Sequence, residues 1–150
     1  MLPTVLLLAL LAPHAQKVAP VPAPVRVESA HYELTWTGTR AEAEEAALVL
    51  EQAWNELAAV LGARPPAKAK LRVAVFADEE ARLRGAWADG ITVPVQSTYA
   101  SFSDVTRKAY VARMGGPAAT RGALLYAACL QYHSLCKSKN LDITRTWYAA

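Results

Sequence analysis

Apolar and polar positions in the first half of the chain predict a strand, a long helix and a second strand. From Val25 to Thr37 apolar residues alternate with polar ones, which is typical of a half-buried strand. From Thr39-Arg-Ala-Glu42, a capping box, apolar residues recur every three or four positions as far as Leu61, and Gly62 ends this helical pattern. The apolar stretch within Lys70–Ala77 then predicts an internal strand.

The second half of the chain predicts a short helix, a hairpin and a second long helix. Asp78 is suited to cap a helix that runs through Arg84, and residues 87–94 have the composition of a loop. Val95–Phe102 and Lys108–Arg113 form a predicted hairpin, and a helix follows from about Ala118 to Leu135. The elements together predict an α+β fold, in which a mixed sheet carries a long packing helix and a C-terminal helix.

The first 24 residues predict export. Met1–Ala12 is apolar but shorter than the ~20 residues that a membrane-spanning helix needs, so we predict no membrane span. The run fits the core of a signal peptide over residues 1–15, with cleavage after Ala12 or Ala15, although a plain apolar N-terminal strand is the alternative. Residues 16–24 contain alternating prolines and predict an extended linker. The expected folded domain is therefore residues 25–150 of a periplasmic or extracellular protein.

Charge is unevenly distributed along the chain. The formal net charge is +3, with 9 basic and 12 acidic residues in 1–104 but 7 basic and 1 acidic in 105–150. The basic residues of the C-terminal third are scattered and lack interleaved aromatic residues, so they predict a solvated surface and no nucleic-acid partner.

Five segments of the C-terminal half carry a resemblance to a known family. They are Ala109-Tyr-Val-Ala-Arg113, Gly115-Gly-Pro117, Thr120-Arg-Gly-Ala-Leu-Leu125, Gln131-Tyr-His133 and Trp147-Tyr-Ala149. Together they resemble the secreted bacterial gluzincin metalloproteases of the peptidase-MA-like group, over about residues 27 to 150. In that family a helix bears a motif similar to H-E-x-x-H, in which two imidazoles bind zinc and the Glu activates a water molecule.

The resemblance implies that every chemical position of the motif has been replaced. Tyr126 lies where the first His would be, Ala127 replaces the general-base Glu, and Leu130 replaces the second His. Ala150 falls on the Glu that is the third zinc ligand, and the chain ends where the family's next helix begins. The C-terminal helix thus lies in the position of the zincin active-site helix but has no catalytic residues, so the resemblance implies a truncated pseudo-peptidase without a cofactor.

The resemblance also implies a binding surface. In zincins the strand before the active-site helix is an exposed edge that pairs with the substrate backbone. Here that strand would be Ala109–Arg113, and backbone pairing with a protein or peptide partner requires no zinc.

One polar set remains on the C-terminal helix. Cys129, His133 and Cys136 have the i, i+4, i+7 spacing that places side chains on one side of a helix, and thiolate and imidazole are zinc ligands. They are the candidates for a metal or thiol site, with buried and helix-end structural roles as the alternative. A disulfide between the two cysteines requires the helix to end near Tyr132.

The sequence therefore predicts a non-catalytic, exported, zincin-like domain that is inert or binds through an edge strand. A metal- or thiol-binding domain is the alternative, and an active zinc peptidase is the least favoured hypothesis.

Overall fold

A computed structural model describes residues 23–62, 64, 69–92 and 99–137. The predicted signal peptide, most of the linker, the Trp147-Tyr-Ala149 segment and Ala150 lie outside the described residues. None of the described helices combines the length and the apolar character that crossing a membrane requires.

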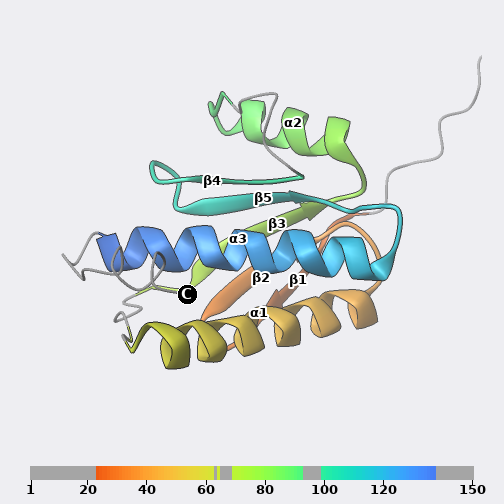
Figure 1. The fold of residues 1–150 in the computed structure, drawn as a ribbon. Helices are drawn as coiled ribbons and strands as arrows, with labels where there is room; N and C mark the ends of the chain where they lie inside the picture. The colour runs from red at the N-terminus through yellow and green to blue at the C-terminus, as the bar shows by residue number, and fades with distance from the viewer. Residues whose placement is uncertain (1–22, 63, 65–68, 93–98, 138–150) are drawn as a thin grey trace, which may run out of the picture.

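The described chain forms an α+β fold with a five-stranded mixed sheet (Figure 1). The elements in chain order are β1 (Val25–Glu28), β2 (Tyr32–Trp36), α1 (Arg40–Leu61), β3 (Leu71–Phe76), α2 (Glu79–Ala88), β4 (Ala100–Ser103), β5 (Lys108–Ala112) and α3 (Pro117–Lys137). The strand order is β1-β2-β3-β5-β4. The three central strands are mutually parallel, whereas β1 and β4 run antiparallel to their neighbours. The predicted fold class is therefore confirmed.

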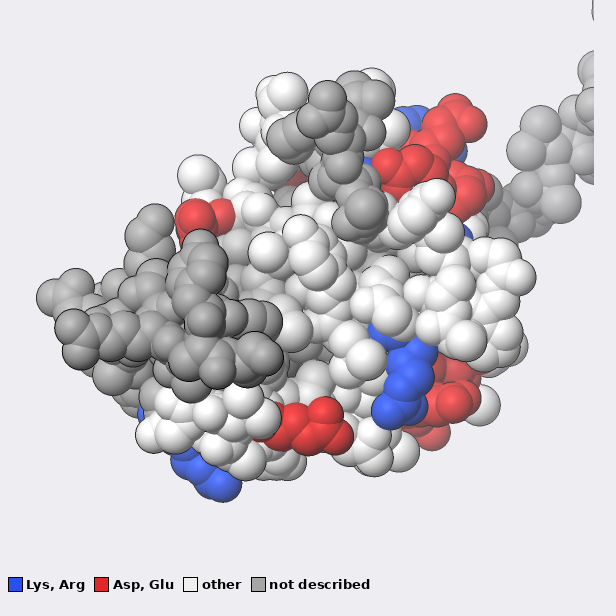
Figure 2. Space-filling view, viewed as in Figure 1, with Lys and Arg blue, Asp and Glu red and all other residues white. Residues whose placement is uncertain are grey.

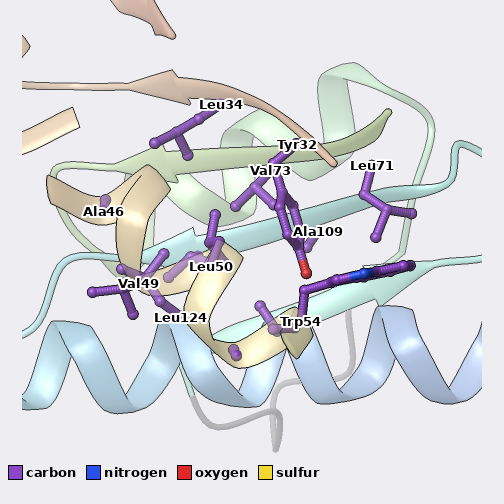
Figure 3. Close-up of a cluster of buried hydrophobic side chains, with 14 of the residues drawn as sticks. Tyr32, Leu34, Ala46, Val49, Leu50, Trp54, Leu71, Val73, Ala109 and Leu124 are labelled. Atoms are coloured by element: carbon purple, nitrogen blue, oxygen red, sulfur yellow. The ribbon is translucent and has the colours of Figure 1, made fainter. Parts of the chain in front are cut away.

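Helices α1 and α3 lie together on one face of the sheet, and α2 lies on the other (Figure 1). The core fills the space between the sheet and the helix pair, where Leu34, Val73 and Leu50 are almost completely buried (Figure 3). Trp54 of α1 packs edge-to-face against Tyr132 of α3 with ring centroids 4.9 Å apart. Burial of these side chains joins α1 and α3 to each other as well as to the sheet.

Local signals in the sequence set both ends of α1 and the start of α2. Thr39 caps α1 in a capping box with Glu42, and Gly62 ends the helix with φ of 61°, a left-handed conformation that glycine adopts without a steric cost. Asp78 caps α2 as predicted, but α2 continues to Ala88. The predicted loop over residues 87–94 therefore begins two residues too early.

The predicted strand over residues 25–37 is two antiparallel strands. Val25 pairs with Trp36 and Glu28 with Glu33, so the chain reverses between β1 and β2. The backbone N–H of Ser29 donates to the carbonyl of Tyr32 at 2.9 Å, which closes the turn. Alternation continues on both sides of a tight turn, so the period-two pattern alone does not reveal it.

The prediction that Ala109–Arg113 is an edge strand is wrong. Strand β5 pairs with β3 on one side and with β4 on the other, and Ala109, Tyr110 and Val111 are completely buried. Its backbone groups are used inside the sheet, so β5 cannot accept a partner strand. Among the described residues the sheet ends at β4 on this side, one strand earlier in the chain.

Candidate functional site

The three residues of α3 that the resemblance aligns with the zinc-binding motif occupy three different environments. Tyr126 is 47% exposed, Leu130 is half-buried, and Ala127 is completely buried. The spacing predicted by the resemblance is present on one helix, but the side chains are a phenol, an isobutyl group and a methyl group. None of them is a zinc ligand or a carboxylate base.

The structure does not bring Cys129, His133 and Cys136 together as a metal site. Cys136 is completely buried, Cys129 is half-buried and His133 is exposed. No three His, Cys, Asp or Glu side chains among the described residues are grouped so that they could hold a metal ion. Burial raises the pKa of both thiols, which favours the neutral thiol over the metal-binding thiolate. Both cysteines are free, and α3 continues past Cys136, so the helix end that a disulfide would require is not there.

A cleft of about 500 Å³ lies at the other end of α3. It opens where β2 and β5 end and where α1 and α3 begin. The lining residues are Trp36, Glu42, Glu45, Ala46, Val49, Arg113, Met114, Gly116, Pro117, Ala118, Thr120, Arg121 and Leu124. In sheets with parallel central strands, the carboxyl ends of those strands are the usual place for a ligand, because the following helices diverge there and leave a crevice.

The lining of the cleft includes an ion pair between Glu42 and Arg113 that also bonds to the backbone. Glu42 accepts hydrogen bonds from the backbone N–H of Thr39 (2.8 Å), the indole of Trp36 (3.3 Å) and the guanidinium of Arg113 (2.9 Å). Arg113 also donates to the carbonyl of Thr37 and lies over the ring of Trp36, 5.4 Å from its centroid. The bonds from Thr39, with smaller contributions from Trp36 and Arg113, lower the pKa of Glu42. This pair positions the start of α1 against the end of β5.

Gly38 allows these groups to approach one another. Its φ is +153°, and a Cβ atom there would lie 2.6 Å from Glu42 Oε2 and 2.6 Å from Trp36 Nε1. A side chain at this position would displace the ion pair, so the turn between β2 and α1 requires glycine.

Two charged side chains that line the cleft have no hydrogen-bond or ion-pair partner among the described residues. Glu45 on α1 and Arg121 on α3 are exposed, and the side chain of neither makes a hydrogen bond or an ion pair with another described residue. Figure 2 shows basic and acidic side chains close together near the N-terminal ends of these helices. The cleft therefore presents one positive and one negative group above a largely apolar lining.

A second polar cluster joins the β1–β2 turn to α1. Glu51 Oε1 accepts from the hydroxyl of Ser29 (2.6 Å) and the backbone N–H of His31 (2.7 Å), and Oε2 lies 2.6 Å from His31 Nδ1. The imidazole of His31 stacks on Trp54 at 4.5 Å. Burial raises the pKa of Glu51, but the hydrogen bonds from His31 and Ser29 outweigh it and lower the pKa overall. The carboxylate has partners for both oxygens, so the cluster is structural.

Sequence reasoning missed both arrangements. Twenty residues separate His31 from Glu51, and Glu51 has the periodicity of a solvated helix face, so no local signal pairs them. The sequence did contain a signal for the cleft. Trp36 precedes the cap of α1, and Arg113 precedes the turn into α3. Two strand-to-helix junctions after parallel strands lie at the same edge of a sheet.

Comparison of the chain with protein-family models, with curated proteins and with solved structures found no match.

Proposed function

We propose that this chain is a non-catalytic, exported domain that binds a small ligand in the cleft between the N-terminal ends of α1 and α3. The observation that carries the proposal is the cleft itself, which has about 500 Å³ of space at the carboxyl ends of the parallel strands. Its mixed lining, largely apolar with a few charged groups, is the composition that small-molecule sites usually have.

The non-catalytic part of the proposal rests on Tyr126, Ala127 and Leu130. By the zincin resemblance, these three residues replace the groups that bind zinc and activate water. The helix that carries them is α3, which follows β5 in the chain as the active-site helix follows its strand in that family. The export part rests on the apolar run of residues 1–12 and the proline-containing segment that follows it.

The binding proposal is tested by filling the cleft. Ala118 lines it and is exposed, whereas Ala119 is exposed on the same helical turn but does not line it. The probe is 8-anilinonaphthalene-1-sulfonate, an anionic dye with apolar aromatic rings whose fluorescence rises when the rings enter an apolar site. We expect saturable dye binding to the wild type, about tenfold weaker binding to Ala118→Trp, and unchanged binding to Ala119→Trp. Equal binding by all three proteins would refute the cleft as the site.

The absence of catalysis is tested with casein in the presence of added zinc. We expect cleavage no faster than in a sample without the protein, and zinc-dependent cleavage that a chelator abolishes would overturn this part.

For export, expression of the whole chain in a bacterium and mass measurement of the product should show loss of the first 12 or 15 residues. An intact N-terminus on the cytoplasmic product would contradict it.

A further inference from the structure

The charges that line the cleft indicate what kind of ligand it would accept, and this step rests on the proposed function. Glu42 and Arg113 pair with each other and bond to the backbone at the start of α1, so their charges already compensate each other. The available charges are those of Glu45 and Arg121, which are exposed and unpaired among the described residues.

These two charges are on different helices, both of which line the cleft. Arg121 is in the second turn of α3, and Glu45 is in the second turn of α1. A ligand with a single negative charge would satisfy Arg121 but would meet the carboxylate of Glu45, and a cation would have the reverse problem. Only a ligand with both charges compensates both side chains.

Apolar side chains make up much of the remaining lining of the cleft. Val49 from α1 and Leu124 from α3 form part of it, together with the half-buried side chain of Met114. An apolar group of the ligand placed there would remove hydrocarbon surface from water at about 25 cal/mol per Å². A methionine side chain can also adjust to groups of different shape.

We infer that the cleft binds a small zwitterion with an apolar side chain, namely an apolar α-amino acid or a short apolar peptide. The carboxylate of the ligand would pair with Arg121, the ammonium group with Glu45, and the side chain would contact Val49, Leu124 and Met114. A cleft of about 500 Å³ is within the size range of small-molecule sites, and both ligands are small enough for such a site.

The probes are L-leucine, the dipeptide leucyl-leucine, 4-methylpentanoate, which lacks the ammonium group, and 3-methylbutylamine, which lacks the carboxylate. Binding to the whole chain is measured by isothermal titration calorimetry. We expect binding of leucine, of the dipeptide or of both, with at least about tenfold weaker binding of the two singly charged analogues. The stronger of the two zwitterions shows whether the natural source is a free amino acid or a peptide.

Charge variants test the assignment of each side chain. Arg121→Gln and Glu45→Gln should each weaken binding of the zwitterion about tenfold, and Glu45→Gln should reduce the preference for the zwitterion over 4-methylpentanoate. Arg26→Gln and Glu56→Gln are matched controls, because both residues are exposed and lie outside the cleft. They should bind as the wild type does.

Failure of the inference is distinguishable from failure of the proposed function. Binding of 4-methylpentanoate as strong as that of leucine, or zwitterion binding unaffected by either charge variant, would overturn the inference. Absence of zwitterion binding while the dye still distinguishes Ala118→Trp from Ala119→Trp would also overturn it but leave the cleft as a binding site. Absence of both would overturn the inference and the proposed function together.

Discussion

Replacing Glu51 with alanine should remove the hydrogen bonds that hold the β1–β2 turn against α1. The substitution removes the acceptor for the Ser29 hydroxyl, the His31 backbone N–H and the His31 imidazole, at distances of 2.6 to 2.7 Å. The side chain of Glu51 is only 19% exposed, so water replaces these bonds incompletely.

The expected loss follows from the number and burial of these bonds. One hydrogen bond to a charged group contributes about 1.5–3 kcal/mol, and three bonds to one carboxylate are not additive. We therefore expect Glu51→Ala to lower the free energy of unfolding by about 2–3 kcal/mol. For a domain of this size that corresponds to a fall in Tm of roughly 5–10 °C.

The assay is urea denaturation followed by far-ultraviolet circular dichroism, with Glu56→Ala as the control. Glu56 is exposed on the same helix and has no ion pair among the described residues, so its removal should change stability by less than about 0.5 kcal/mol. Equal stability of the two variants would refute the reasoning, because the cluster would then contribute no more than an ordinary surface carboxylate.

The pH dependence of stability gives an independent check on the same cluster. The pKa of Glu51 is lowered from its ordinary 4.5 in the folded protein, so the unfolded chain binds the proton more tightly. The stabilisation is complete well above pH 4.5 and is lost as the pH falls through the folded-state pKa. The stability difference between the wild type and Glu51→Gln should therefore shrink below pH 4.5, and a difference that grows there would contradict the assignment.

Three further outcomes are expected. Gly38→Ala should lower stability by about 2 kcal/mol or more in urea denaturation, because φ is +153° and the new Cβ meets Glu42 and Trp36; wild-type stability would contradict this. Gly85→Ala should lower Tm, because the new Cβ collides with the ring of Phe76. Gly122→Ala should raise stability by about 0.5–1 kcal/mol, because no atom lies within 4 Å of the new Cβ. The reverse order of the two stabilities would be inconsistent with the packing. Elemental mass spectrometry of the dialysed protein should find less than about one tenth of an equivalent of zinc, and a full equivalent that Cys129→Ser abolishes would restore the thiol-metal alternative.

Local sequence determined both ends of α1 and the start of α2. Thr39 with Glu42, Gly62 and Asp78 act on backbone groups within a few residues, so their effects are visible in the sequence and the structure confirms them. The α+β class followed from the order of these elements.

Sheet order and the functional surfaces were decided only by tertiary structure. A buried inner strand and an apolar edge strand have the same hydrophobic pattern, so the sequence could not show that Ala109–Arg113 lies between β3 and β4. The hydrogen bonds that decide this come from residues about thirty-five positions away in one neighbour, as in the pairing of Val73 with Ala109.

Tertiary packing also decided which polar side chains are buried and which meet. Helical spacing placed Cys129, His133 and Cys136 near one another on α3, but packing against the sheet and α1 buries Cys136 and leaves His133 exposed. Conversely, Glu45 and Arg121 are 76 residues apart and share no motif, and only the packing of α1 beside α3 brings them to one cleft. Local interactions decided where α1 begins and ends and where α2 begins, and long-range burial decided which side chains meet.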